Sequence, residues 1–345
     1  SGSRASTAEA FLKPARKRRN LTVITGAQAS RVLFDGDRAT GVEYAVGKKT
    51  ARATAAREVL LCGGALNSPQ LLMLSGMGPA EELRAHGIEL RVDSPGVGGN
   101  LQDHLDVCTM QRCTQKITYD HASDIAVGLQ YYLFKQGPGT SNIAEAGGFL
   151  RSKVAEDARP DVQFHLVPAQ LDDHGRHQMP GYGYTLHACY LRPHSRGRLR
   201  LASANPADKV RIEANYLCDA EGRDWQMMLE CVRLSREIFA QPAFAPYRGE
   251  EIFPGGEVQG EAGLREFIAK KAESIYHPVG TCRMGNDADA VVDPELRVRG
   301  VKNLREVDAS VMPKLVGGNT NAPTIMIAER AADLIRGVPP RKQAR

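Results

Sequence analysis

Short apolar runs alternate with turn residues over the first hundred positions, which predicts small strands and helices. Residues 21–25 and 57–62 are apolar runs of strand length, so both are expected to be buried strands. Residues 29–46 alternate apolar and polar positions around Asp35-Gly36-Asp37, the pattern of a β-hairpin. Helices are expected over 68–74, over 79–86, and over 6–19, which begins with the capping-box residues Ser6-Thr7-Ala8-Glu9.

Gly, Pro, Ser and Asn dominate residues 92–101, which marks a domain boundary. Runs typical of antiparallel strands follow at 107–114, 161–167, 182–192 and 198–202, and helical runs at 121–134, 220–240 and 263–272. A last strand over 303–308 leads through a glycine-rich loop into a helix over 323–336. The pattern predicts an α/β layer from both ends of the chain with an α+β domain inserted between them. The expected boundaries are 1–99 plus 283–345 for the first and 100–282 for the second.

The composition of this 345-residue chain indicates its protein class and its cellular compartment but does not indicate a reaction. Hydrophobic residues at 42% and charged residues at 25%, with a formal net charge of +5, are typical of a globular protein. The dense basic run Arg16-Lys17-Arg18-Arg19 is expected at a solvated helix end, with contact to anionic lipid or nucleic acid as the alternative. Seven scattered cysteines form no CxxC pair, which indicates reduced thiols in a cytosolic setting.

Three strand ends carry small or acidic residues that a cofactor could approach. They lie at 24–26, 61–64 and 307–309, and ligands of parallel sheets bind at the carboxyl ends of strands; tight turns are the alternative. His277, between Tyr276 and Pro278, suits either a base or a structural turn. The glycine-rich segment 317–324 leads into the last helix, whose positive end favours an anion. No metal site is predicted, because no metal-ligand spacing connects His165, His174, His177, His187 and His194.

Five segments together resemble the sequence signatures of the glucose–methanol–choline (GMC) oxidoreductase family. They read GALNSPQLLMLSGMG (64–78), VGGNLQDH (97–104), HPVGTCRMG (277–285), VDAS (307–310) and GGNTNAPT (317–324). Their order and spacing span nearly the whole chain and are most similar to the bacterial choline dehydrogenase and medium-chain alcohol dehydrogenase branch. The resemblance implies a Rossmann-like FAD-binding domain with an inserted substrate domain, built on an antiparallel sheet backed by helices.

The resemblance also implies roles for single residues. His277 would be the catalytic base that takes the proton of the alcohol hydroxyl, and Asn321 would hydrogen-bond that hydroxyl. FAD would lie against Gly63, Gly64, Asn100, Asp308, Ala309, Asn319, Thr320 and Pro323. Glu145 and Tyr276 are expected near the substrate, with a solvated strand-edge glutamate as the alternative for Glu145. His104, which ends the LQDH segment, is expected to be structural.

A dinucleotide-binding unit is missing from this sequence. Such a unit needs a strand, a G-x-G-x-x-G turn and a helix; Gly96-Val97-Gly98-Gly99 comes nearest, and no helix is predicted after it. The chain opens on Ser1-Gly2-Ser3, which suggests the middle of a longer protein. The FAD-binding domain is therefore expected to be incomplete. The 345-residue chain alone is expected to be inactive and not to hold FAD.

The predicted function is oxidation of a primary alcohol to an aldehyde by hydride transfer to FAD, with a quinone or another non-oxygen acceptor taking the electrons. The alternatives are a choline dehydrogenase, an oxidase using oxygen, a lyase on the same scaffold and a flavin-free binding module. Choline is not expected to be the best substrate, because quaternary ammonium groups favour an aromatic cage and Trp225 is the single tryptophan. A cytoplasmic location is expected, with peripheral contact at the inner membrane face as an alternative, and no nucleic-acid partner is predicted.

Overall fold

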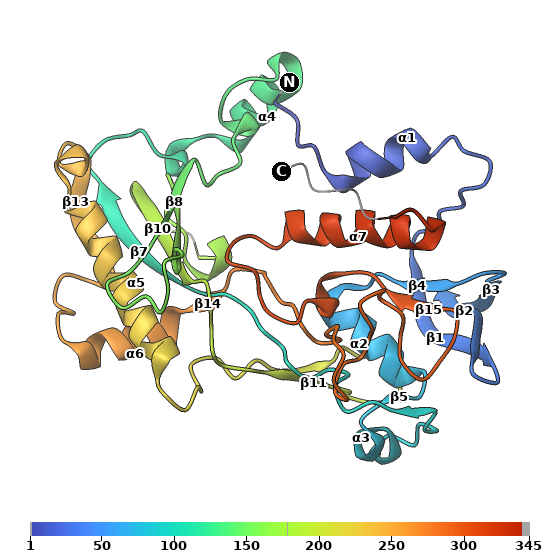
Figure 1. The fold of residues 1–345 in the computed structure, drawn as a ribbon. Coiled ribbons are helices and arrows are strands. Elements are labelled where there is room, and N and C mark those ends of the chain that lie inside the picture. The colour runs from blue at the N-terminus through green and yellow to red at the C-terminus, as the bar shows by residue number, and fades with distance from the viewer. Residues whose placement is uncertain (1, 178, 340–345) are drawn as a thin grey trace. The chain divides into compact units, whose positions relative to one another are not determined.

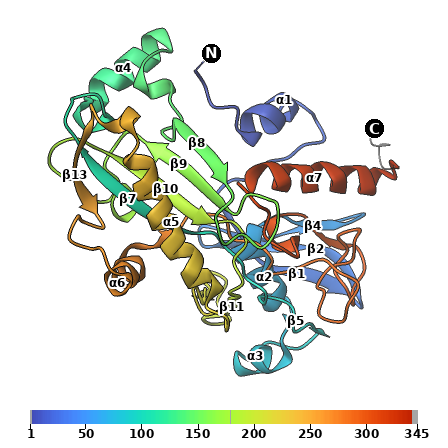
Figure 2. The same ribbon diagram turned by 60° about the vertical axis from the view of Figure 1, so that its left-hand side comes forward.

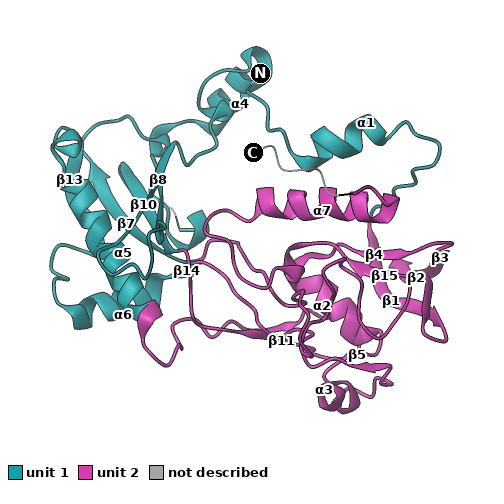
Figure 3. Cartoon of the chain, viewed as in Figure 1, with its two compact units in different colours: residues 1–25, 105–190, 225–273 teal, residues 26–104, 191–224, 274–345 magenta. Residues whose placement is uncertain are grey.

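The computed structural model describes residues 2–177 and 179–339, which divide into two compact units (Figure 3). Unit 1 comprises residues 1–25, 105–190 and 225–273, and unit 2 comprises residues 26–104, 191–224 and 274–345. Of the expected inserted domain, 100–282, residues 100–104, 191–224 and 274–282 fall in unit 2. Backbone hydrogen bonds from Leu199 to Gly98 and between Gly197 and Leu101 tie residues 191–224 to unit 2.

An antiparallel six-stranded sheet forms the centre of unit 1. Its strands are β7 (Leu105–Cys113), β8 (Ala146–Leu150), β9 (Val162–Val167), β10 (Gly183–Tyr190), β13 (Arg248–Phe253) and β14 (Glu273–Ser274). They pair in the order β13-β7-β10-β9-β8, with β14 also on β7. Helices α5 (Arg223–Phe239) and α6 (Glu261–Lys271) lie along one side of this sheet (Figure 2). Helix α4 (Asp124–Phe134) lies between β7 and β8 in the chain. The predicted antiparallel sheet backed by helices is confirmed, although β8, β13 and β14 are absent from the sequence prediction.

The N-terminal segment differs from its prediction. The Ser6 hydroxyl accepts a hydrogen bond from the Glu9 N–H at 3.3 Å, as a cap does, but the π-helical turn Ala8–Leu12 and α1 (Lys13–Ala15) end the helix well before residue 19. Residues 21–25 form no strand, and the side chains of Leu21, Val23 and Ile24 are 37–50% exposed. An apolar run becomes a buried strand only where other strands or helices cover it, and the described chain leaves this run uncovered.

Unit 2 combines small sheets with helices (Figure 1). The predicted hairpin is confirmed as β1 (Ala27–Asp35) and β2 (Arg38–Val46), and the unpredicted β3 (Lys49–Thr54) extends it. The parallel pair consists of β4 (Val59–Leu61) and β15 (Leu304–Glu306). The remaining elements are β5 (Met77–Gly78), β6 (Val92–Asp93), β11 (Arg198–Arg200), β12 (Arg211–Glu213), α2 (Gly64–Leu74), α3 (Ala80–Ala85) and α7 (Asn321–Arg336).

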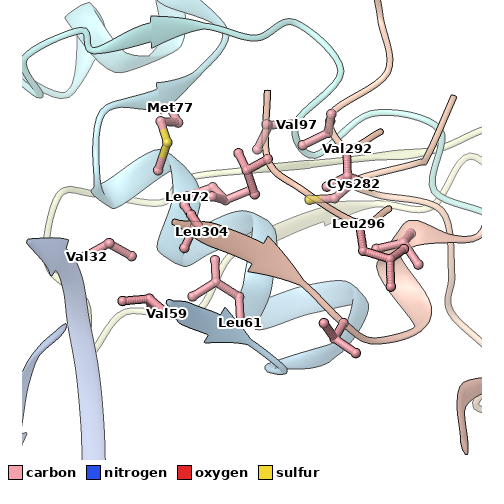
Figure 4. Packing of buried hydrophobic residues seen from close by; sticks show 14 of the residues in the cluster. Val32, Val59, Leu61, Leu72, Met77, Val97, Cys282, Val292, Leu296 and Leu304 are labelled. Carbon is pink, nitrogen blue, oxygen red and sulfur yellow. The ribbon is translucent and has the colours of Figure 1, made fainter. Parts of the chain in front are cut away.

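The hydrophobic core of unit 2 holds these elements around the parallel pair (Figure 4). Leu61 and Leu304 from the two strands pack in one cluster with Leu72 of α2. Ile327 and Ala331, four residues apart on one face of α7, belong to the same cluster. The core therefore places the carboxyl ends of β4 and β15 in one packed body with α2 and α7. Within the described residues, none of the helices has the length and apolarity that crossing a bilayer requires.

Candidate active site

The carboxylate of Asp308 ties together the ends of the two parallel strands. Its Oδ2 accepts hydrogen bonds from the Gly64 N–H (2.8 Å) and the Ser68 hydroxyl (2.6 Å). Its Oδ1 accepts one from the Ser310 N–H (2.8 Å). Because Asp308 is buried, these donors replace the water that its charge has lost. The predicted cofactor residues at the end of β4 and after β15 thus form one tightly held pair of loops.

A cavity of about 290 Å³ opens beside the loop that follows β4. Its lining comes from β1, β4, α2 and the loop, and includes Gln28, Leu60, Gly63 and Asn67. Gly64 has a φ of +79°, and no heavy atom lies within 4 Å of the position that a Cβ would take there. A ligand can therefore approach the backbone at Gly64 closely, as the sequence predicts.

A second carboxyl group, that of Glu306 at the end of β15, lies two residues before Asp308 and has a very different environment. Glu306 is fully buried; the Ser310 hydroxyl donates to its Oε1, whereas its Oε2 has no hydrogen-bond partner among the described residues. Burial raises the pKa of Glu306 from 4.5 to about 8, and the neighbouring Asp308 carboxylate raises it as well. Glu306 is therefore protonated at neutral pH and carries no charge into the core.

This raised pKa makes the stability of the chain depend on pH. The folded state retains the Glu306 proton up to about pH 8, whereas the unfolded state releases it near pH 4.5. Between these values the folded state binds more protons, so the free energy of unfolding should fall as pH rises, by at most roughly 1.4 kcal/mol per pH unit. Glu306→Gln should flatten that slope in urea unfolding measured across this range. Glu266→Gln, an exposed control, should leave it unchanged, and an equal slope in wild type and Glu306→Gln would contradict the assignment.

Paired backbone hydrogen bonds hold the segment that contains His277 against residues 102–104. Val279 and Gln102 exchange N–H···O bonds of 2.9 and 3.0 Å, and the Ile275 N–H donates to the His104 carbonyl oxygen at 3.1 Å. This short antiparallel pairing brings the predicted catalytic His277 beside His104. The sequence assigns His104 a structural role and gives no sign of this pairing.

Asp103 fixes the backbone of His277 from the other strand. Its Oδ1 accepts a hydrogen bond from the His277 N–H at 2.9 Å. Its Oδ2 accepts hydrogen bonds from the hydroxyls of Ser274 and Tyr216. Tyr276, one residue earlier, has a φ of +66° and a side chain that is 68% exposed, whereas His277 is only 7% exposed. The turn therefore buries the histidine and leaves the predicted substrate residue Tyr276 at the surface.

The imidazole rings of His277 and His104 are in direct contact. Their Nδ1 atoms lie 2.9 Å apart, and the rings meet edge to face. The Nε2 of His104 lies 3.3 Å from the carbonyl oxygen of Leu191. Burial lowers the pKa of His104 to about 3, and the charge of a protonated His277 would lower it as well. His104 is therefore neutral at physiological pH.

These contacts determine which nitrogen of His277 carries a proton. A carbonyl oxygen only accepts hydrogen bonds, so the single N–H of neutral His104 lies on Nε2 and points to Leu191. The Nδ1 of His104 then has a lone pair, and His277 donates its Nδ1–H to it. Neutral His277 consequently has its own lone pair on Nε2, which is the arrangement that a general base needs.

The loop that leads into α7 places a side-chain amide beside that lone pair. The Asn319 Nδ2 lies 3.3 Å from the His277 Nε2, so the residue predicted to contact FAD lies against the predicted base. Asn321, predicted to bind the hydroxyl, is the first residue of α7 and is exposed. Thr320 precedes it without a side-chain cap hydrogen bond, and Pro323 lies in the first turn. The first N–H groups of α7 therefore lack a side-chain cap, and the positive helix end favours negative charge.

Asn100 and Ala309 shape the loop after His277. The Asn100 Nδ2 donates to the Gly280 carbonyl oxygen at 3.1 Å, and the Gly280 N–H donates to the Ala309 carbonyl oxygen at 3.3 Å. Both predicted cofactor residues thus connect the His277 loop to the loop after β15.

Glu145 lies in unit 1, immediately before β8. Its side chain is exposed, and the hydroxyls of Tyr119 and Ser141 donate to its Oε1. Two local donors on one carboxylate oxygen fix the orientation of this side chain and leave the other oxygen for a further partner.

Comparisons with known proteins show the family to which the chain belongs. Models described as GMC oxidoreductase match residues 1–106 and 193–328, and the chain belongs to this family of FAD-dependent oxidoreductases. It is 50% identical over 341 residues to alcohol dehydrogenase (acceptor) of Pseudomonas putida, covering 97% of this chain and 61% of that protein. It is 48% identical over 345 residues to mitochondrial choline dehydrogenase of Homo sapiens, covering 98% of this chain and 57% of that protein.

Solved structures share the fold of the chain. Pyridoxine 4-oxidase from Mesorbium loti superposes with a TM-score of 0.86 at 31% identity, covering 98% of this chain and 63% of that one. Formate oxidase from Aspergillus oryzae superposes with a TM-score of 0.87 at 27% identity, covering 94% and 62%. The chain thus has the GMC oxidoreductase fold and spans about three fifths of the length of these relatives.

Proposed function

We propose that the protein to which this chain belongs oxidises a primary alcohol to an aldehyde with FAD and passes the electrons to a quinone or another non-oxygen acceptor. The observation that carries this proposal is the His277 imidazole, whose Nε2 lone pair is set by its hydrogen bond to His104. A buried histidine with a fixed basic nitrogen suits removal of a hydroxyl proton near neutral pH. FAD, when bound, accepts the hydride from the alcohol carbon.

Two observations support the proposal that residues of this chain bind a flavin. The backbone at Gly64 is open to a ligand, and the N-terminus of α7 has no side-chain cap. The loops at Gly63–Gly64 and Asp308–Ala309 would hold the cofactor together with Asn100. Residues 319–323 would lie along its ring system, where the positive helix end stabilises negative charge.

In this proposal the described residues carry out the proton transfer of the reaction. The alcohol hydroxyl donates to the His277 Nε2 and takes the place now occupied by the Asn319 amide. As the O–H bond breaks, His277 becomes a cation, and its Nδ1–H stays on the neutral His104. Asn321 hydrogen-bonds the oxygen while alkoxide character develops. The C–H bonding pair leaves as hydride, so proton and hydride together balance the oxidation.

Anaerobic mixing of the FAD-loaded protein with a primary alcohol tests this function. Stoichiometric bleaching of the flavin spectrum, with one aldehyde formed per flavin, is the expected result. A lyase would consume the alcohol without net bleaching, and a flavin-free binding module would bring no flavin spectrum. Reoxidation by a quinone that is much faster than by oxygen is expected, and the reverse order would identify an oxidase.

A neutral medium-chain alcohol should have a higher kcat/KM than choline. Trp225 is the single tryptophan of the chain, and the guanidinium of Arg265 lies over its ring, 4.9 Å from the centroid. That face is therefore already occupied by a cation and is not free for a quaternary ammonium group. Initial rates with 1-octanol and choline decide between the two substrates, and a clear preference for choline would refute this expectation.

A further inference from the structure

The sheet of unit 1 brings together metal-binding residue types that are far apart in the sequence. On β10 His187 lies directly opposite Cys108 of β7, and it lies directly opposite His165 of β9. Residues opposite one another in neighbouring strands point to the same face, so these three side chains form a row across three strands. Asp106, two residues before Cys108, lies on that face as well.

The atoms of this row are close enough to share one ion. The Cys108 Sγ lies 3.1 Å from the His187 Nδ1 and 3.6 Å from the Asp106 Oδ2, and the His187 Nδ1 lies 2.5 Å from that oxygen. Tetrahedral zinc, with bonds of about 2.0–2.3 Å, separates its ligand atoms by roughly 3.3–3.6 Å. The sulfur–oxygen distance of 3.6 Å already fits, whereas the sulfur–nitrogen distance of 3.1 Å is shorter than this range and would lengthen slightly around an ion. The nitrogen–oxygen contact would open when an ion replaces the proton that the pair now shares.

Two polar atoms in the row have no hydrogen-bond partner among the described residues: the Oδ1 of Asp106 and the Nε2 of His165. Asp106 is 1% exposed, and a buried carboxylate oxygen without a partner is costly. A cation beside the carboxylate would remove that cost. His165 would add a further nitrogen ligand from the same row.

The chemistry of the donors selects the ion. Thiolate and imidazole favour zinc and similar transition metals over calcium or magnesium, which prefer oxygen ligands. One thiolate and one carboxylate neutralise a divalent cation, which suits a buried position. Cys108 also lines a cavity of about 290 Å³ together with Asp172, His174 and Glu273, and this cavity gives an ion access to the row.

We propose that Asp106, Cys108 and His187, with His165, bind one divalent transition metal ion of the zinc class and cross-link β7, β10 and β9. The site lies entirely in unit 1. It is independent of the proposed alcohol oxidation and of His277.

Cobalt titration of the chelator-treated 345-residue chain tests this site, in a background where the exposed Cys62 and Cys218 are serine. Saturating Co²⁺ should give tetrahedral d–d bands and a thiolate charge-transfer band at one ion per chain, and Zn²⁺ should remove both. Cys108→Ser should abolish the charge-transfer band, and His187→Ala should abolish tight binding. Cys231→Ser, which changes another buried free cysteine of the same unit, should leave the spectrum intact.

A second measurement covers the case in which Cys108→Ser fails to fold. Zinc should raise the melting temperature of the chelator-treated Cys62→Ser/Cys218→Ser chain, and native mass spectrometry should show one tightly held ion. No thiolate band at saturating Co²⁺ would overturn the proposal, because the row would then be a self-contained hydrogen-bonded cluster. A band that survives in folded Cys108→Ser would overturn it equally.

Discussion

In the complete, FAD-loaded protein, replacing His277 by alanine should slow the anaerobic reduction of FAD by alcohol at least about 100-fold, the lower range for loss of a general base. His277 is the residue whose basic nitrogen the surrounding hydrogen bonds define, and water is a much weaker base at neutral pH. Binding of FAD and of the alcohol should change little, because the backbone of residue 277 is held by Asp103 through its N–H. Stopped-flow measurement of flavin bleaching at saturating alcohol isolates this step.

His86→Ala provides the matched control for that experiment. His86 directly follows α3 in the same unit, where its N–H caps the helix, and no hydrogen bond joins it to the His277 segment among the described residues. Its variant should reduce flavin at the wild-type rate. If His277→Ala, correctly folded and loaded with FAD, also reduces flavin at a near-normal rate, then His277 is not the base.

The second large effect is expected at His104. His104→Leu removes the lone pair that accepts the His277 Nδ1–H, so His277 is free to adopt the other tautomer and to rotate. A misplaced base lowers the rate of flavin reduction by roughly tenfold or more. His104→Asn should recover most of the rate, because the Asn Oδ1 takes the position of the imidazole Nδ1 and also accepts a hydrogen bond. If His104 had a purely structural role, His104→Asn and His104→Leu should slow flavin reduction to a similar extent.

Tautomers can be observed without any turnover. In the ¹⁵N-histidine-labelled chain, the His277 signals, assigned with a His277→Gln sample, should show a protonated Nδ1 and an unprotonated Nε2 in wild type and in His104→Asn. His104→Leu should shift the population towards a protonated Nε2. A wild-type spectrum with the proton on Nε2 would reject the assignment of the base nitrogen, whatever the reaction catalysed by the whole protein.

Hydrophobic periodicity and turn residues predicted those helices and strands that depend on neighbours close in sequence. The hairpin around Asp35-Gly36-Asp37, the helices other than the one after Ser6, and the strands β7, β9 and β10 of unit 1 follow from periodicity and turn residues, and the structure confirms them. The run 21–25 has the same apolar character but is exposed, because burial depends on what packs against a strand. The helix after Ser6 ends at Ala15 although its capping signal is present.

The site was predicted through motifs, and its internal contacts were not. The HPVGTCRMG and LQDH segments are readable as separate signatures, yet the contact of His277 with His104 depends on a pairing between residues that are 173 positions apart. The proximity of Asn319 to the basic nitrogen likewise depends on how α7 begins. The row of Cys108, His187 and His165 depends on strand register, which residue types and spacing do not encode, so five scattered histidines gave no sign of it.

The hydrogen bond between the Gly64 N–H and the Asp308 carboxylate can form only after both residues have been synthesised. Gly64 and Asp308 are separated by 244 positions. At a synthesis rate of about 5–20 residues per second, roughly 12–50 s pass between the appearance of the glycine loop and that of its acidic partner. During that interval the sheet of unit 1 is made and can fold, since its strands are joined by shorter loops. The cofactor loops would therefore close last, after the sheet of unit 1 has formed.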